Sequence, residues 1–359
     1  MPPSRSTAPR PRLRHALALL LALGAALLLS ACGSDDSSSD GASATAAQSA
    51  GNTTSAQSGA FPVTIEHKLG TTEIPAAPER VVTLGLSDQD AVLALGVAPI
   101  AVTDWYGDHP YAVWPWAQRQ LGDARPTVLA RGEFTGNQAY DYEELLKLRP
   151  DLILALYGGV TQKQYDTLSK IAPTVLQPRG VVDYGIPWQT ATEVAGRALG
   201  RAEEARALVA EVDARFAAAA RAHPQFDGRS AVVAERFEDG SSFARSPTDP
   251  RTRFLTSLGF RLPAEIARRS GDKDGATISD ERFDLLDNDL LLWNLGFAPE
   301  ARRTLDDSDL YQQLDVVRDG RVVYVTDPLA SAALTWSTVL SIPYALDRVL
   351  PQLDRAVRG

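Results

Sequence analysis

The chain has little of several residue types that build chemical sites. It contains one cysteine, so no disulfide can form within the chain and no zinc or iron–sulfur site can be built from several cysteines. Its histidines, His15, His67, His109 and His223, are scattered and form no metal-binding motif. We therefore expect no cofactor and no histidine-based metal site.

Basic residues are not in excess. Lys and Arg number 36 against 45 Asp and Glu, which gives a formal net charge of −9. A protein that holds phosphate backbones over a broad surface needs an excess of positive charge, so we expect no nucleic-acid partner. The sequence also holds no Gly-x-Ser-x-Gly, no Walker loop and no His-Glu-x-x-His. We expect no enzyme activity, and a Ser-His-Asp group assembled in space would be the alternative, an exported lipoprotein hydrolase.

The amino-terminal residues have the pattern of an export signal. Four arginines and no acid precede the apolar stretch 16–31, which is shorter than the roughly 20 residues of a membrane-spanning helix. Its end, Leu-Ser-Ala before Cys32, resembles a bacterial lipobox, in which the cysteine becomes the lipidated first residue of the mature protein. We predict a lipoprotein signal at 1–31 and a lipid anchor on the extracytoplasmic face of the cell membrane. An ordinary signal with a chance cysteine is the alternative.

The region after the signal differs from the rest of the chain. Loss of residues 1–31 removes four arginines and no acid, which changes the formal net charge from −9 to −13. Residues 32–60 are mostly Ser, Gly, Ala, Thr, Asp and Gln and offer almost nothing to bury, so they predict a disordered tether behind the lipidated cysteine.

From Phe61 onward, short β-branched runs alternate with helical patterns, which predicts α/β layers with parallel strands. One helix–turn–strand phrase occurs twice. In the first copy Glu143 lies eight residues before Asp151, and in the second Glu281 lies eight residues before Asp289. This repeat predicts two related lobes.

The segment from Trp188 to Ala222 has no internal proline and carries apolar residues at helical spacing, with a break expected at Gly200. We predict two Rossmann-like lobes with central parallel sheets, a long rigid helix that joins them, and a ligand cleft between them. The expected boundaries are 61–187 for the amino-terminal lobe, 188–223 for the connecting helices and 224–359 for the carboxy-terminal lobe.

Aromatic residues gather in an insertion of the first lobe. Trp105 and Tyr106 follow a predicted strand directly, and the carboxyl ends of parallel strands are where open α/β sheets bind ligands. Tyr157 and Trp293 follow the two copies of the repeated strand, so we expect them on facing walls of one cleft. All four are candidate ligand-binding residues.

Arginines in predicted loops are the candidates for polar ligand contacts. A guanidinium can meet an anionic ligand through two hydrogen bonds, and Arg131, Arg236 and Arg245 are placed to do so. The alternative for each is a solvated surface arginine.

Several phrases together resemble a known family. They are the lipobox, Arg80-Val81-Val82 with Leu95-Gly96-Val97, Leu148-Arg149-Pro150-Asp151-Leu152-Ile153, and Arg318-Asp319-Gly320-Arg321-Val322-Val323-Tyr324-Val325. This set is similar to the iron-siderophore substrate-binding proteins of ABC importers, of the periplasmic-binding-protein type, whose wider fold includes the cobalamin binders.

The resemblance implies a monomeric receptor that captures a ferric siderophore without chemistry and delivers it to a permease dimer with its ATPase. It implies that Glu143 and Glu281 pair with arginines of the permease, and that Arg131 lies near iron-bound oxygens. A cobalamin or haem carrier of the same fold, or a structural lipoprotein of the cell envelope, would be alternatives. The sequence leaves open whether the siderophore is an anionic catecholate, which needs several arginines, or a hydroxamate of low charge.

Overall fold

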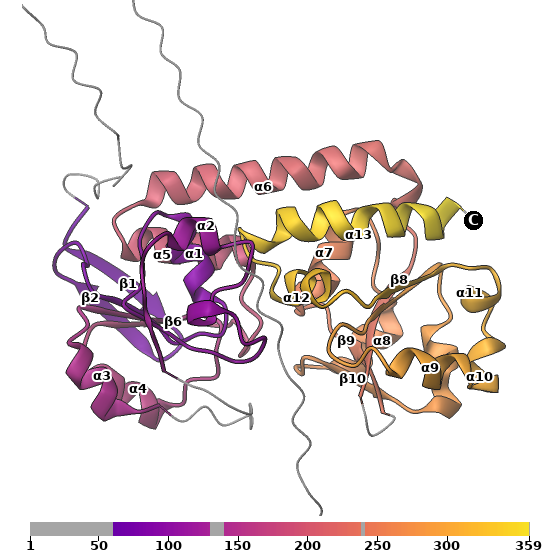
Figure 1. The fold of residues 1–359 in the computed structure, drawn as a ribbon, viewed down its shortest axis with the longest axis horizontal. Helices are drawn as coiled ribbons and strands as arrows, with labels where there is room; N and C mark the ends of the chain where they lie inside the picture. The colour runs from indigo at the N-terminus through magenta and orange to yellow at the C-terminus, as the bar shows by residue number, and fades with distance from the viewer. Residues whose placement is uncertain (1–59, 130–139, 238–240, 359) are drawn as a thin grey trace, which may run out of the picture. The chain divides into compact units, whose positions relative to one another are not determined.

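The computed structural model describes residues 60–129, 140–237 and 241–358. They belong to one compact unit that contains two α/β lobes (Figure 1). The predicted export signal, Cys32, the tether up to Gly59 and Arg131 lie outside the described residues. Within the described ranges, none of the helices combines the length and apolarity that crossing a bilayer requires.

The first lobe is built on a five-stranded sheet in the order β5-β4-β3-β6-β7, with all neighbours parallel as predicted. An antiparallel hairpin, β1 and β2, precedes it. The strands are β1 (Val63–His67), β2 (Gly70–Ile74), β3 (Val81–Thr83), β4 (Ala101–Val102), β5 (Thr127–Val128), β6 (Leu152–Ala155) and β7 (Thr174–Leu176).

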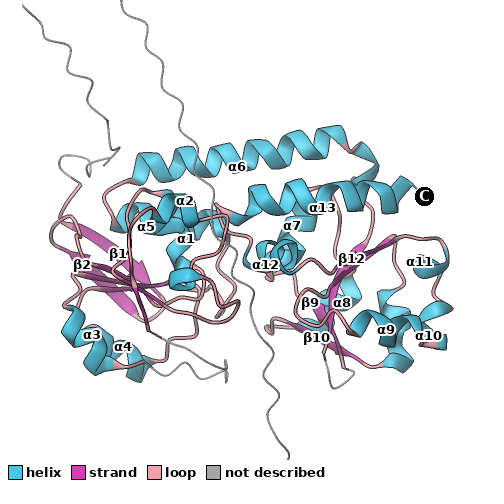
Figure 2. Cartoon of the chain, in the orientation of Figure 1, coloured by secondary structure: helices cyan, strands magenta, loops and turns pink. Residues whose placement is uncertain are grey.

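Helices cover both faces of this sheet (Figure 2). Leu152 and Leu154 of β6 pack beneath α1 and α5, whereas Ile153 and Ala155 pack toward α3 and α4. Burial on both faces explains why the strand reads as a continuous apolar run. The helices of this lobe are α1 (Asp88–Ala94), η1 (Pro110–Ala112), α2 (Gln118–Leu121), α3 (Tyr142–Leu148) and α4 (Gln162–Leu168).

The second lobe has a five-stranded sheet in the order β10-β9-β8-β11-β12. Strands β8, β11 and β12 are parallel, as predicted for a central parallel sheet, whereas β9 is antiparallel to both of its neighbours. The few residues between Arg236 and Ser242 are too short for a parallel crossover, which needs about a dozen. The strands are β8 (Ala231–Arg236), β9 (Ser242–Arg245), β10 (Gly275–Ile278), β11 (Leu290–Asn294) and β12 (Val322–Val325).

Two groups of helices sandwich the second sheet. Helices α7, α12 and α13 pack with part of α6 on one face, while α8, η3, α9, α10 and α11 pack on the other. The elements are η2 (Pro224–Phe226), α7 (Pro250–Ser257), α8 (Ala264–Ser270), η3 (Asp280–Leu286), α9 (Ala301–Asp306), α10 (Asp309–Gln312), α11 (Asp315–Arg318), α12 (Pro328–Trp336) and α13 (Ser341–Arg358).

The lobes are joined by the helices α5 (Trp188–Ala198) and α6 (Ala202–Ala222), with the predicted break at Gly200, where φ is +67°. Helix α6 extends along both lobes (Figure 1). Its Ala205 belongs to the core of the first lobe, and its Val212 and Phe216 belong to that of the second. A helix anchored in both cores is a stiff connector.

The repeated phrases occupy matching places in the two sheets. Strands β6 and β11 lie beside β3 and β8, each the first strand along the chain in its five-stranded sheet. Asp151 accepts hydrogen bonds of 2.8 Å from the backbone N–H groups of Glu79 and Arg80, just before β3. Asp289 accepts one of 2.8 Å from the N–H of Ser230, just before β8. The two aspartates therefore fix the backbone just before β3 and β8 in the same way.

Candidate functional site

A cavity of about 970 Å³ opens between the two lobes. Its walls come mainly from segments that follow strands of both sheets at their carboxyl ends, the position at which open α/β sheets bind ligands. This cavity, called the cleft below, is lined by Leu86, Trp105, Tyr106, Tyr157, Val182, Asp183, Tyr184, Glu235, Arg236, Phe237, Arg245, Thr248, Asp249, Arg251, Asp274, Asn294, Phe297, Ala298, Thr335 and Trp336.

Aromatic rings from both lobes meet at the cleft. The ring centroid of Trp105 lies 4.9 Å from that of Trp336 on α12, and the ring of Tyr106 stacks on Trp336 at 5.7 Å. Tyr106 also meets Phe297 of the second lobe edge-on at 4.6 Å. Each such pair contributes about 0.5–1.5 kcal/mol beyond area burial. The inserted aromatic segment thus reaches across to the second lobe.

Tyr157 completes this wall. It follows β6, as predicted, and its ring lies 6.1 Å from that of Trp336 and 5.8 Å from that of Tyr184. Burial raises the pKa values of the Tyr157 and Tyr106 hydroxyls well above the ordinary value. Both side chains therefore stay neutral at physiological pH. The structure brings Trp105, Tyr106 and Tyr157 together in the cleft.

A buried group of ion pairs forms another part of the lining. Glu235 of β8 pairs with both Arg245 of β9 and Arg251 of α7. Asp249 caps α7 and accepts hydrogen bonds from the Arg251 side chain, 2.8 Å from Nε and 2.7 Å from Nη2. Arg245 Nη1 lies 3.3 Å from the Oδ2 atom of Asp274. These five residues are called the ion-pair cluster below.

Asp249, Arg245 and Arg251 of this cluster are charged near neutral pH. Burial alone would raise the pKa of Asp249, but the Arg251 guanidinium outweighs it and holds that pKa below its ordinary value. Burial, together with repulsion from Arg251, lowers the pKa of Arg245 to about 10. Both arginines therefore keep their charge and face three carboxylates.

Arg236 is also matched by an acid. Its guanidinium meets both carboxylate oxygens of Asp280, at 2.7 and 3.0 Å, and donates to the Ser242 hydroxyl at 2.9 Å. Arg236 and Arg245 both line the cleft, but they end β8 and β9 instead of lying in loops. The alternative, that they are solvated surface arginines, is wrong, because Arg236 and Arg245 are only 6% and 8% exposed.

Trp293 does not line the cleft. It was predicted on a cleft wall, yet it is fully buried between the second sheet and η3, and its Nε1 donates to the Tyr311 hydroxyl at 2.9 Å. In the repeat, Trp293 corresponds to Ala155, which lies inside β6, and not to Tyr157, which follows β6. This strand register explains why the prediction is wrong. Its neighbour Asn294 lines the cleft instead.

Sequence reasoning missed Glu235, Asp249 and Arg251. Asp249 before Pro250 is a signal for a helix start, because Asp is favoured at the cap and Pro at the first helical position. That signal places α7, but it gives no sign that Arg251 would also meet Glu235 of β8. Pairing between separate segments has no local pattern that could reveal it.

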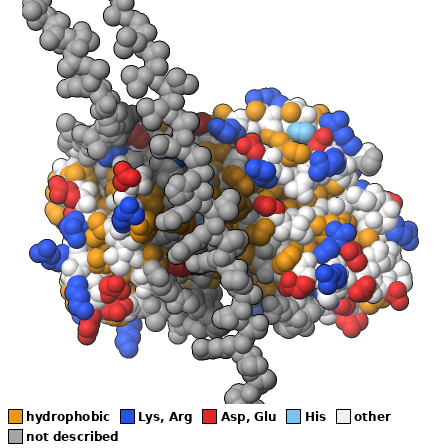
Figure 3. Space-filling view, viewed as in Figure 1, with side chains coloured by type: hydrophobic (Ala, Val, Ile, Leu, Met, Phe, Trp, Pro, Cys, Tyr) orange, Lys and Arg blue, Asp and Glu red, His pale blue; other side chains and the backbone are white. Residues whose placement is uncertain are grey.

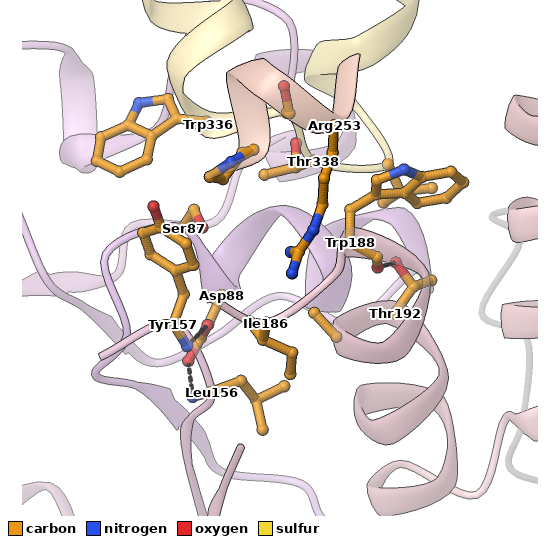
Figure 4. Close-up of a pocket in the computed structure, with 14 residues that line it drawn as sticks. Ser87, Asp88, Leu156, Tyr157, Ile186, Trp188, Thr192, Arg253, Trp336 and Thr338 are labelled. Carbon is orange, nitrogen blue, oxygen red and sulfur yellow. Dashed lines mark hydrogen bonds between the residues drawn. The ribbon is translucent and has the colours of Figure 1, made fainter. Parts of the chain in front are cut away.

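A second, smaller cavity has a volume of about 30 Å³ (Figure 4). Tyr157 and Trp336 line both this cavity and the cleft. The Asp88 carboxylate accepts N–H bonds from Leu156 at 2.7 Å and from Tyr157 at 2.9 Å, and burial raises its pKa to about 6. The Arg253 side chain enters from α7 and donates to the Gly185 carbonyl at 2.8 Å. This cavity is far below the few hundred Å³ that small-molecule sites occupy, so the cleft is the candidate ligand site.

Glu143 and Glu281 lie away from the cleft lining, on α3 and η3, and both are exposed.

Charged side chains of both signs are interspersed over the face seen in Figure 3, without one broad basic surface there. In the parts of the chain that the structure describes, no group of three or more His, Cys, Asp or Glu residues is placed to hold a metal ion.

Comparison with known proteins identifies what this fold is similar to. The family model described as periplasmic binding protein matches residues 81–329. The probable siderophore-binding lipoprotein YfiY of Bacillus subtilis is 27% identical over 352 residues, which are 94% of this chain and 97% of that protein.

Two solved structures are also similar. A periplasmic solute binding protein from Mycobacterium smegmatis is 36% identical with a TM-score of 0.72, over 82% of this chain and 98% of that one. PiaA of Streptococcus pneumoniae in complex with ferrichrome is 25% identical with a TM-score of 0.69, over 82% of this chain and 99% of that one.

Proposed function

The chain belongs to the periplasmic binding protein family, and from this premise we propose that it is the substrate-binding lipoprotein of an ABC importer that captures a ferric siderophore outside the cytoplasm. The observation that carries the proposal is the aromatic cleft between the lobes. Its volume of about 970 Å³ suits a compact chelate, and its stacked rings offer apolar faces. The B. subtilis relative is named a siderophore-binding lipoprotein, and PiaA was solved with ferrichrome, which supports the same ligand class.

Binding without chemistry is part of the proposal. Family members are binding proteins, and we propose no enzyme activity and no cofactor for this chain. His67 and His223 are engaged with Thr72 and Asp354, and neither lines the cleft, which argues against a hydrolase there. Because α6 is anchored in both cores, the lobes should close only slightly around the ligand.

Delivery of the bound chelate to a membrane permease is a further part of the proposal. We propose that Cys32 carries the lipid anchor, that the protein acts as a monomer, and that Glu143 and Glu281 pair with basic residues of a permease dimer served by an ATPase. An exposed leucine accompanies each glutamate: Leu146 lies one turn along α3, and Leu310 lies on α10, which packs against η3.

Tryptophan fluorescence of the purified full chain tests the ligand class. Trp105 and Trp336 line the cleft, so titration with ferric hydroxamates, ferric catecholates and ferric citrate should give saturable quenching by at least one chelate. Iron-free chelators correct for nonspecific quenching. A response to cobalamin or haem alone, or to none of the chelates, would refute the proposal.

A pair of variants locates the binding site. Phe297 is 44% exposed in the cleft, and Leu310 is 49% exposed outside its lining. Phe297→Ala should weaken chelate binding about tenfold through loss of one aromatic face, whereas Leu310→Ala should leave the affinity unchanged. Equal effects of the two changes would argue against binding in the cleft.

A further inference from the structure

The cleft has three arginines in its lining, and each is matched by carboxylates. Arg236 is held by Asp280, and Arg251 by Glu235 and Asp249. Arg245 is shared among Glu235, Asp249 and Asp274. Three guanidinium groups thus face four carboxylates, so the polar part of the cleft carries no positive excess.

This arrangement penalises an anionic ligand. To bind one, Arg245 or Arg251 would have to turn donors away from Glu235 or Asp249, which are 6% and 4% exposed. Arg236 would likewise have to leave Asp280. A buried carboxylate left without its partner costs several kcal/mol, and it would also repel the incoming anion. A ligand without net negative charge meets neither penalty.

The polar groups that remain for a ligand are mostly neutral. Among the described residues, four buried atoms of the cleft-lining side chains have no hydrogen-bond partner: Tyr106 Oη, Asn294 Oδ1, Trp336 Nε1 and Arg245 Nε. Three belong to uncharged side chains, and the fourth is a single N–H of one arginine. A small movement of these side chains would let them meet the oxygens and amides of an uncharged chelate.

The charge of a ferric chelate depends on its donor groups. Three hydroxamates bring three negative charges and neutralise Fe³⁺, whereas three catecholates bring six and leave a trianion, and citrate adds ionised carboxylates. We propose that this cleft selects a hydroxamate-type ferric chelate of low net charge and rejects catecholate and carboxylate chelates. This inference rests on the proposed function and names its substrate class.

Competition between chelates of different charge tests it. The purified full chain is titrated, with tryptophan fluorescence as the signal, against ferrichrome as the neutral trihydroxamate, ferric enterobactin as the trianionic tricatecholate, and ferric citrate. Ferrichrome should bind at least about 100-fold more tightly than either anion, since like charges brought together at an interface cost several kcal/mol. Comparable or tighter binding of an anion would overturn the inference and leave the proposed function standing. Failure of every ferric chelate would instead remove the proposed function.

A charge variant links the preference to the ion-pair cluster. The side chain of Asp274 is 66% exposed, so Asp274→Asn should fold, and it leaves Arg245 with fewer carboxylate partners. The ratio of ferric citrate affinity to ferrichrome affinity should rise about fivefold, the effect of one partly screened charge. Asp315→Asn is the matched control, because the Asp315 side chain is 64% exposed, pairs with Arg318 and lies outside the cleft lining. An unchanged ratio in Asp274→Asn, or the same rise in the control, would contradict the assignment.

Discussion

The direction in which a strand residue points decides whether it lines the cleft or joins the core. Trp293 and Asn294 are neighbours at the end of β11, and successive residues of a strand point to opposite faces. The Trp293 side chain therefore enters the core above η3, whereas Asn294 donates to Glu235 at 3.3 Å and to the Thr335 hydroxyl at 3.0 Å. One step along the strand separates a core residue from a cleft residue.

Asp90 is a single residue that joins the two lobes. Its Oδ2 atom accepts a hydrogen bond of 2.8 Å from Trp116 Nε1 and one of 2.5 Å from the Thr338 hydroxyl, which follows α12. Burial raises the pKa of Asp90 from 3.8 to about 6, although these two hydrogen bonds oppose the rise. The folded protein therefore holds the Asp90 proton more tightly than the unfolded chain does.

Ionisation of Asp90 makes the stability of the protein depend on pH. Between about pH 4 and pH 6 the unfolded chain loses the Asp90 proton first, so this residue makes the protein less stable as the pH rises, by up to about 3 kcal/mol. In Asp90→Asn this penalty is absent. The difference in Tm between the variant and the parent should therefore shift in favour of the variant as the pH rises from 4 to 7, measured by thermal unfolding.

The control for this experiment is Asp347→Asn, which makes the same change at an exposed position of α13. Its Tm difference from the parent should stay constant over the same pH range. If the Tm difference between Asp90→Asn and the parent is also constant from pH 4 to 7, Asp90 does not titrate in this range.

Among the elements, α5 and α6 meet at a joint that leaves no room for a larger residue at Gly196. A Cβ atom built on Gly196 would lie 2.3 Å from the Cβ of Ala205 and 3.0 Å from the carbonyl oxygen of Arg201. Gly196→Ala should lower the free energy of unfolding by about 1–3 kcal/mol, since overpacking at a helix contact forces the backbones apart. Ala207→Ser, at an exposed position of α6, should have little effect. Urea unfolding measures both, and equal stability of the two variants would contradict the close contact.

The elements also show where prediction from sequence succeeds. The run at 152–156 and the helix interrupted at Gly200 are local patterns, and both appear in the structure as β6 and as α5 with α6. The antiparallel direction of β9 could not be inferred from the repeat, which indicates parallel strands in both lobes; it depends on the short connection after β8. Local periodicity fixes a strand or helix, but direction depends on the connection.

The residues of the cleft could be predicted only in part, because local patterns place strand ends but not the pairing of distant side chains. Trp105, Tyr106 and Tyr157 follow strands, and strand ends converge at one edge of a sheet, so their position could be inferred. Glu235, Asp249 and Arg251 meet because β8 and the start of α7 fold together, and their mutual charges cannot be read from spacing. The electrostatic character of the cleft, which decides the proposed ligand class, therefore appears only in the structure.

At the scale of the whole molecule, the two lobes present equivalent acidic positions. Glu143 and Glu281 lie the same distance before β6 and β11, and these strands hold the same place in their sheets. A permease dimer has two related halves, so a protein with two related lobes can offer one glutamate to each half. The exposed Leu146 and Leu310 would add an apolar contact beside each charge.

Charge reversal separates docking from ligand capture. Glu143→Arg combined with Glu281→Arg should reduce uptake of radioactive iron as the ferric chelate by at least about tenfold, because two like-charge contacts replace two attractive ones. Chelate affinity of the purified variant should stay within about twofold of the parent, since neither glutamate lines the cleft. Glu73→Arg combined with Glu193→Arg reverses the same number of exposed charges on β2 and α5 and should leave uptake unchanged. Loss of uptake in both double variants would point to net charge and not to docking. Normal uptake in the Glu143 and Glu281 double variant would refute these two glutamates as the permease contacts, while leaving the cleft and its ligand untouched.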